Sequence, residues 1–263
     1  MCLLVLAWRL HPRYRLVVAA NRDEFHARPA AGLAAWDDAP GVIGGRDLPA
    51  NGAWLAIDVQ RRFGIVTNFR EFGRQRRSAP SRGGLIPAYL TGTQAPTEYL
   101  QSLETDAPGY AGFNLLLADQ NSLWYASNRA DQFGRELAPG IYGLSNEFLD
   151  TPWPKLVRVR ARFSALLQSA ESDSRTALFA GLFALLADRE TAPPDTVPPG
   201  DLSPEWARKL SAPFVLDATY GTRCSTVLTI SSEGTLAVAE RRFTSDGSQF
   251  AETEHVLNAA DRR

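Results

Sequence analysis

The sequence has few of the residues that build disulfide frameworks and metal sites. Its 263 residues include two cysteines, Cys2 and Cys224, and three histidines, His11, His26 and His255. Neither cysteine belongs to a Cys-x-x-Cys pair. This excludes a disulfide scaffold and makes a structural zinc site untenable. We therefore expect a reduced, cytoplasmic protein without a metal.

An excess of one charge and a long apolar run are also missing. The 28 basic residues are balanced by 29 acidic ones, so the chain has no electrostatic footprint for nucleic acid or an anionic membrane. The apolar run over residues 2–8 is too short to cross a membrane, and no basic segment precedes it as in a signal peptide. We expect neither a nucleic-acid partner nor a transmembrane segment, and we interpret the run as a strand that begins the fold.

Several familiar catalytic motifs are absent as well. The sequence has no G-x-G-x-x-G and no G-x-x-x-x-G-K, which excludes the usual glycine-rich cradles for dinucleotides and phosphates. It has no H-E-x-x-H zinc motif and no C-x-x-C-H haem attachment. Gly143-Leu144-Ser145-Asn146-Glu147 begins like a G-x-S-x-G nucleophile elbow but lacks the closing glycine.

The order of the predicted elements indicates the fold class. Clusters of strands alternate with pairs of helices, which favours a single α+β domain over residues 1–263 with largely antiparallel strands under helices. We interpret residues 25–52 as one long loop, residues 70–84 as an exposed loop and residues 191–201 as a linker or surface arm. Strands are predicted at residues 3–9, 15–20, 54–59, 63–68, 113–118, 123–127, 141–144, 214–216, 226–231 and 236–243, and helices at residues 85–90, 97–103, 154–168 and 176–186.

Cys2 is the leading candidate nucleophile because of its position. Removal of Met1, which a small second residue generally permits, would place a thiol and an α-amine on one residue. The amine has a reference pKa of about 7.7–8.0, close enough to neutrality for it to act as the base for the thiol. The alternative is a buried apolar cysteine on a core strand, which is the commoner place for a free cysteine.

A polar cluster, Asn21-Arg22-Asp23-Glu24, follows the second apolar run. If the first two strands pair through a turn at residues 11–13, residues 2 and 22 are equidistant from residue 12, and the cluster lies beside Cys2. An arginine and a carboxylate there could hold a thiolate and orient the ammonium group. The alternative is a solvated strand end with an internal ion pair.

Five short motifs occur in order along the chain. Together they resemble the NRDE family, also called the transport and Golgi organisation 2 family, nearly end to end. More remotely, the layout is similar to the cysteine N-terminal-nucleophile (Ntn) hydrolases of the choloylglycine hydrolase and penicillin V acylase type, which implies a four-layer αββα sandwich. The motifs are Met1-Cys2, Asn21-Arg22-Asp23-Glu24, Thr67-Asn68-Phe69-Arg70, Gly143-Leu144-Ser145-Asn146 and Gly221-Thr222-Arg223-Cys224-Ser225-Thr226.

The resemblance implies roles for the residues around Cys2. Cys2 would be both nucleophile and base, Asp23 would bind its amine, and Arg22 would lie against the thiolate. In the acylases the arginine usually precedes the aspartate by several positions, whereas here the two are neighbours. Adjacent strand residues point to opposite faces, so both can face Cys2 only if a bulge or turn intervenes. Otherwise Asn21 and Asp23 face the site, and Arg22 points elsewhere.

The remaining implied roles concern the oxyanion and the ligand. Asn68 and Asn146 would donate hydrogen bonds to the oxyanion, and Arg223 would complete the polar cluster. The first hypothesis is thus an amide (C–N) hydrolase or acyl-transfer enzyme that needs no cofactor. The resemblance also links eukaryotic members to Golgi organisation, lipid and acyl-CoA balance and haem movement.

The second hypothesis is therefore a non-catalytic trafficking protein on the same fold that handles haem or lipid and acyl-CoA. His26 and His255 are candidate haem ligands, besides His11 and the two thiols. A structural or interaction protein is a third possibility, but the sequence has no repeat or coiled coil to support it. We expect a small-molecule or apolar ligand: an amide, acyl-CoA or another lipid, or haem.

Overall fold

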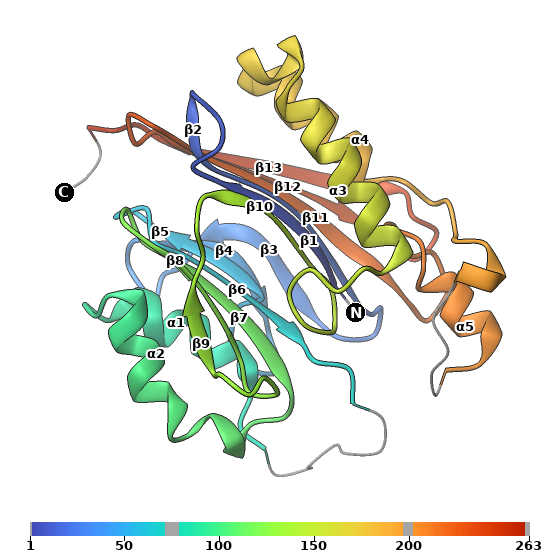
Figure 1. The fold of residues 1–263 in the computed structure, drawn as a ribbon, viewed down its shortest axis with the longest axis horizontal. Coiled ribbons are helices and arrows are strands. Elements are labelled where there is room, and N and C mark those ends of the chain that lie inside the picture. Colours follow the sequence, from blue (N-terminus) through green and yellow to red (C-terminus); the bar gives the residue numbers. More distant parts are fainter. Residues whose placement is uncertain (1, 72–78, 197–201, 261–263) are drawn as a thin grey trace. The chain divides into compact units, whose positions relative to one another are not determined.

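The chain forms two compact units, each built from separate stretches of sequence. The computed structural model describes residues 2–71, 79–196 and 202–260 (Figure 1). The prediction of a single domain over residues 1–263 stays a prediction. The first unit comprises Met1–Ala27, Pro139–Ser145 and Leu149–Val256, and the second comprises Arg28–Ala138, Asn146–Phe148 and Leu257–Arg263.

The first unit is built on a six-stranded sheet with the strand order β10-β1-β2-β11-β12-β13. Strands β10, β1, β2, β11 and β12 pair with their neighbours in antiparallel fashion. The predicted hairpin of the first two strands is confirmed, with Cys2 opposite Arg22. The strands are β1 (Cys2–Trp8), β2 (Tyr14–Phe25), β10 (Gly140–Leu144), β11 (Tyr220–Ser231), β12 (Leu236–Phe243) and β13 (Gln249–Leu257).

Helices cover one face of this first sheet. Alternate residues of β1 and β2, among them Leu3 and Val17, pack against α3 and α4 in one apolar cluster that includes Phe163 and Leu182. The intervening residues of β1 are also buried, which explains why its sequence is apolar at consecutive positions rather than at alternate ones. The helices of this unit are α3 (Pro154–Leu167), α4 (Arg175–Leu186) and the short α5 (Pro204–Lys209), with 3-10 turns at Ala170–Asp173 and Pro194–Thr196.

The second unit contains a seven-stranded sheet with the order β3-β4-β5-β6-β7-β8-β9, whose paired strands are antiparallel. Helices α1 and α2 pack on one of its faces, where Tyr89 and Leu100 join Val66 and Leu115 in a second apolar cluster. The elements are β3 (Ala30–Ala35), β4 (Val42–Asp47), β5 (Leu55–Asp58), β6 (Phe63–Asn68), β7 (Phe113–Ala118), β8 (Leu123–Ser127), β9 (Gly134–Glu136), α1 (Leu85–Thr91) and α2 (Pro96–Glu104), with 3-10 turns at Arg82–Gly84 and Ala107–Gly109.

Two of the predicted segments were wrong. The long loop expected over residues 25–52 contains β3 and β4, whose alanines and glycines carry weak strand propensity. Gly44 is nevertheless required there, because a Cβ at this position would lie 2.7 Å from the Cβ of Ala56 on the paired strand β5. The strand expected at residues 214–216 does not form: the Phe214 N–H bonds to the Asp188 carbonyl rather than to a sheet.

Other segments were missed or lie partly outside the described residues. Strands β9 and β13 were not predicted from the sequence. Residues 72–78 of the predicted exposed loop and residues 197–201 of the predicted linker lie outside the described residues.

The predicted α+β class with largely antiparallel sheets is confirmed. Each unit supplies one sheet and one layer of helices, so all four layers of the αββα type are present. Among the described helices, none combines the length and the apolar character that crossing a bilayer requires.

Candidate active site

Cys2 begins β1 and takes part in a row of side chains that crosses four strands. It lies directly opposite Arg22 on β2, and Arg22 lies opposite Cys224 on β11. Residues directly opposite one another in a sheet project to the same face. Cys2, Arg22 and Cys224 therefore share one face of the first sheet, and Cys224 is opposite Arg242 of β12 on the same face.

Asn21 and Asp23 project to the opposite face of the first sheet, the face that carries the helices. Their neighbour Arg22 is the residue that shares the face of Cys2. The alternative in which Arg22 points away while Asn21 and Asp23 face the thiol is therefore wrong. The reason is the hairpin register itself, which sets residue 22 rather than residue 21 or 23 opposite residue 2. The observed bulge lies in β11, between Thr222 and Cys224, and not in β2.

The environment of the Cys2 thiol keeps it protonated in the chain that carries Met1. Burial raises its pKa above the ordinary value of 9.0, and the negative charge of Asp23 adds to this. The Asp23 backbone N–H, which hydrogen-bonds the thiol, and the Arg22 guanidinium act in the opposite direction. Cys2 is nonetheless partly exposed, whereas Cys224 is buried. Burial and the nearby Glu240 raise the pKa of Cys224 well above its usual range.

Asp23 is a buried carboxylate with defined partners. One of its oxygens accepts a hydrogen bond from the Thr222 hydroxyl at 2.7 Å, and its backbone carbonyl accepts one from the Tyr220 hydroxyl at 2.9 Å. Burial raises the pKa of Asp23, while the positive charge of Lys155 opposes this shift more strongly than any other group. Lys155 was not a predicted site residue. It is 3% exposed at the start of α3, and its one clue in the sequence is that lysine occurs at only two positions.

Asn21 is fully engaged in holding the sheet to its helical layer. Its Nδ2 donates to the carbonyl oxygens of Leu186 and Pro213, at 2.9 Å each, and its Oδ1 accepts from the Ser225 hydroxyl at 2.6 Å. Leu186 ends α4, where backbone carbonyls lack partners within the helix. This geometry assigns Asn21 a structural role, and its catalytic role stays a prediction.

Arg223 occupies the bulge of β11 and binds the end of β2. Its Nη1 donates to the carbonyl oxygens of Phe25 at 2.8 Å and His26 at 3.2 Å. Burial and the positive charge of Arg22 lower its pKa. Arg223 thus belongs to the same polar cluster as Arg22. The charge of Arg22 acts on Arg223, and Arg223 binds the end of the strand that carries Arg22.

Ser145 is a residue of this site that the sequence analysis did not assign. Its hydroxyl donates to the Cys2 backbone carbonyl at 2.8 Å, just beyond the end of β10. Ser145 belongs to the Gly143-Leu144-Ser145-Asn146 motif, but only Asn146 of this motif was predicted to be a site residue.

The second unit brings together the two predicted oxyanion residues, Asn68 and Asn146. Asn68 is the last residue of β6 and is exposed, whereas Asn146 is 4% exposed. The Asn146 Nδ2 donates to the Asn68 carbonyl at 2.8 Å, and the Arg70 N–H donates to the Asn146 carbonyl at 2.7 Å. Burial lowers the pKa of Arg70, and the nearby Glu147 opposes this shift.

Two of the three histidines have hydrogen-bond partners for at least one ring nitrogen. The His26 ring is hydrogen-bonded to the Asp217 carbonyl at 3.0 Å, and the His11 ring to the Ser172 hydroxyl at 3.0 Å. Within residues 2–71, 79–196 and 202–260, no three His, Cys, Asp or Glu side chains gather as metal ligands would. Haem as a ligand, with His26 and His255 as candidate ligands, stays a prediction.

The fold and the site define an α+β protein with a candidate thiol centre at the start of its first strand. The chain belongs to the family Transport and Golgi organisation 2, whose family model matches residues 1–245. This confirms the family resemblance.

The relatives cover nearly the whole chain. The sequence is 34% identical to the Transport and Golgi organization protein 2 homolog of Bos taurus, an alignment that covers 92% of each chain. It is 33% identical to the mouse (Mus musculus) homolog, over 87% of this chain and 86% of the relative. Among solved structures, a Caenorhabditis elegans ortholog of N-acylethanolamine-hydrolyzing acid amidase matches with a TM-score of 0.41 and 14% identity, covering 86% of this chain and 92% of that one.

Proposed function

We propose that this protein is a cysteine amide hydrolase or acyl-transfer enzyme whose nucleophile is Cys2, activated by its own α-amine after removal of Met1. The observation that carries the proposal is the position of Cys2: the residue is partly exposed, lies opposite Arg22 on β2, and its thiol is hydrogen-bonded by the Asp23 backbone N–H. A positive charge and an N–H donor are the groups that favour a thiolate.

Removal of Met1 supplies the missing base. With Met1 attached, the nitrogen of Cys2 is an amide that cannot accept a proton, and burial keeps the thiol protonated. After removal, the nitrogen is an amine with a reference pKa of about 7.7–8.0. Maturation would thus convert an inert thiol into a nucleophile with an attached base.

The reaction follows from these groups. The amine takes the thiol proton as Sγ attacks the carbonyl carbon of the substrate amide. The tetrahedral intermediate collapses, the ammonium group returns the proton to the leaving nitrogen, and a thioester remains on Cys2. Water, deprotonated by the amine, or an acceptor nucleophile then attacks the thioester carbon. The C–S bond breaks, the acyl product leaves, and the ammonium group returns the proton to the Cys2 thiolate. Asp23 binds the ammonium group between these steps, and Arg22 stabilises the thiolate.

The oxyanion roles of Asn68 and Asn146 are part of the same proposal. Both are amide side chains, the type that donates to a developing negative charge in acyl transfer. The family resemblance supports this assignment. A hydrogen bond from the Asn146 Nδ2 to the Asn68 carbonyl keeps the two residues together in the second unit.

The test is covalent labelling of the purified protein. Intact-mass spectrometry first establishes whether Met1 has been removed. A β-lactone probe is then expected to acylate Cys2 in the wild type, and Cys2→Ser is expected to abolish this adduct. Cys224→Ser is the matched control, because it removes the other thiol and is expected to leave the adduct in place. A lysine inserted between Met1 and Cys2 would retain the methionine and so leave the thiol without an amine.

Three results would contradict the proposal. They are full retention of Met1, an adduct that survives Cys2→Ser, and equal acylation of the variant that retains Met1. Absence of any adduct, together with saturable binding of haem or acyl-CoA, would favour the non-catalytic ligand-handling function.

A further inference from the structure

The segment that follows β6 is fixed by its backbone on both sides. The Phe69 N–H donates to the Gly112 carbonyl at 2.9 Å, and the Arg70 N–H donates to the Asn146 carbonyl at 2.7 Å. The Asn146 side chain in turn donates to the carbonyl of Asn68, the residue just before Phe69, at 2.8 Å. The positions of Asn68 and Asn146 therefore depend on where this segment lies.

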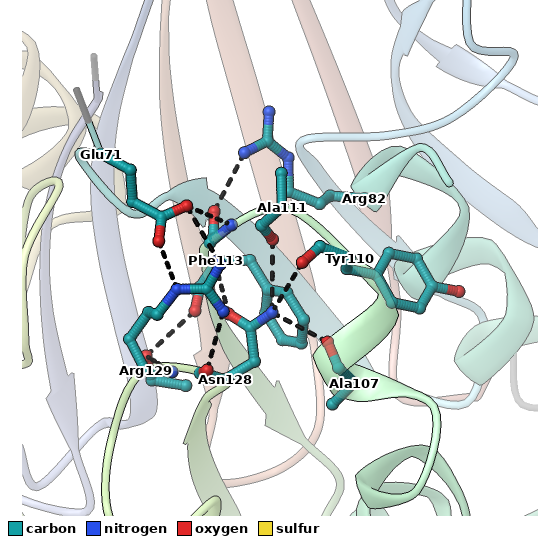
Figure 2. Close-up of polar contacts among 10 residues, drawn as sticks. Glu71, Arg82, Ala107, Tyr110, Ala111, Phe113, Asn128 and Arg129 are labelled. Carbon is teal, nitrogen blue, oxygen red and sulfur yellow. Dashed lines mark hydrogen bonds and ion pairs between the residues drawn. The ribbon is translucent and has the colours of Figure 1, made fainter. Parts of the chain in front are cut away.

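Glu71 closes this arrangement with a carboxylate that is 13% exposed (Figure 2). It forms a two-point ion pair with Arg129, in which Nη2 lies 3.0 Å from Oε2 and Nε contacts Oε1. Its Oε2 also accepts the Gly112 N–H at 3.0 Å. The fit around Gly112 is close, since a Cβ there would lie 2.8 Å from Glu71 Oε2 and 2.9 Å from the Phe69 Cβ. Two-point pairs between arginine and carboxylate add geometric specificity to their energy.

Asn128, the neighbour of Arg129, binds the residues before and after Gly112, Ala111 and Phe113 (Figure 2). Asn128 Oδ1 accepts the Phe113 N–H at 2.8 Å, and Arg82 Nη1 donates to the Gly112 carbonyl at 2.9 Å. Glu71 thus binds a framework that is itself fixed. The Nδ2 of Asn128 donates to the carbonyl oxygens of Ala107, Tyr110 and Ala111.

We infer that Glu71 and Arg129 are a positioning pair that fixes Asn68 and Asn146 in the geometry needed for acyl transfer. The pair acts through the backbone between Asn68 and Glu71 and through Gly112. Neither side chain is assigned a contact with the substrate. The inference rests on the function proposed above, in which the two asparagines donate to the oxyanion.

The test compares Glu71→Gln with Asp47→Asn. Glutamine keeps the shape of Glu71 but removes the charge and sets an amide N–H₂ against the guanidinium. Asp47 is a matched control in the same unit, because it also forms a two-point pair, with Arg28, and accepts a backbone N–H, from Ala50. The two carboxylate side chains are similarly buried, at 13% exposure for Glu71 and 11% for Asp47. Arg129→Lys serves as the second variant, since it keeps the charge but loses the planar fork.

Two readouts are needed. Amide hydrogen exchange at Phe69 and Arg70 reports whether the segment has loosened. The rate of Cys2 acylation by the β-lactone, divided by the rate of Cys2 alkylation by iodoacetamide, reports oxyanion stabilisation, because alkylation forms no oxyanion. We expect Glu71→Gln to accelerate the exchange and to lower this ratio about 10- to 100-fold, since a displacement of ~1 Å can cost 10²-fold. Arg129→Lys should have a smaller effect in the same direction, and Asp47→Asn should change neither readout.

The outcomes separate this inference from the proposed function. Unchanged exchange at Phe69 and Arg70 in Glu71→Gln would overturn the positioning role, and so would faster exchange with an unchanged acylation ratio. A wild-type protein that is not acylated at Cys2 would refute the proposed function. The catalytic part of the inference would then fall with it, and the exchange rates would still decide whether Glu71 and Arg129 hold the segment.

Discussion

The side chain of Asn21 offers a quantitative test of how the first sheet is held to its helices. It is 1% exposed and makes three hydrogen bonds, to the carbonyls of Leu186 and Pro213 and to the Ser225 hydroxyl. Asn21→Ala would remove all three and leave three buried polar groups without this partner. Ser225→Ala would remove only the bond at 2.6 Å between Ser225 and Asn21.

The magnitudes follow from the number of bonds lost. A net contribution of about 1 kcal/mol per hydrogen bond gives a loss of about 3 kcal/mol for Asn21→Ala and about 1 kcal/mol for Ser225→Ala. The loss for Asn21→Ala can reach about 5 kcal/mol, because a buried group left unpaired costs more than the bond was worth. Asn21→Asp is nearly isosteric, yet it would set a carboxylate oxygen against the Leu186 and Pro213 carbonyls. We therefore expect Asn21→Asp to be at least as destabilising as Asn21→Ala at neutral pH. In acid it should be less destabilising, because the protonated carboxyl group again has a hydrogen-bond donor.

Urea denaturation followed by tryptophan fluorescence measures these free energies of unfolding. The double variant Asn21→Ala/Ser225→Ala supplies the cycle: its loss should be smaller than the sum of the two single losses, because the shared bond is counted once. The reasoning would be refuted by a loss below 1 kcal/mol for Asn21→Ala, or by losses of equal size for Asn21→Ala and Ser225→Ala.

Three further predictions concern charge and the oxyanion. Burial raises the pKa of Asp23, so the charged carboxylate is less stable in the folded chain than in the unfolded one; Asp23→Asn should keep or raise the Tm at pH 7 while abolishing Cys2 acylation, and a lower Tm would contradict this. Burial lowers the pKa of His11 below 6.5, so stability should fall as the pH drops below that value. Urea titrations should show that the free energy of unfolding falls less between pH 7.5 and pH 5 for His11→Gln than for the wild type. Equal falls would count against the burial of His11 as the cause. Asn68→Ala should lower the acylation rate of Cys2 by about 10²-fold and leave iodoacetamide alkylation unchanged, whereas an unchanged acylation rate would remove Asn68 from the oxyanion site.

The sequence predicted the elements that carry strong apolar patterns. Strands β6, β7, β8 and β12 lie at the predicted residues, since each contains a short run of apolar or β-branched residues near turn signals. Strands β3 and β4 were missed because small residues fill them, and their pairing is favoured by close backbone packing rather than by propensity. Strand β13 was missed as well, because its polar residues resemble those of a surface segment.

The sequence predicted which residues form the candidate site, but only part of how they are arranged. Equal spacing from the turn was enough to set Cys2 opposite Arg22. The structural role of Asn21 was out of reach, because its partners Leu186 and Pro213 are more than 160 residues away in sequence. Lys155 was missed for the same reason, since a lysine at the start of a helix gives no sign in the sequence that it is buried near a strand end.

The adjacency of Arg22 and Asp23, a departure from the acylase pattern, is compatible with a regular strand. The thiol of Cys2 is a side chain and projects to one face, the face of Arg22. The nitrogen of Cys2 is a backbone atom at the very start of β1, and a strand backbone lies between the two faces. After loss of Met1 the amine would therefore be open to a carboxylate from the opposite face, the face of Asp23. One residue from each face can then serve the two functional groups of Cys2, and β2 needs no bulge to present them.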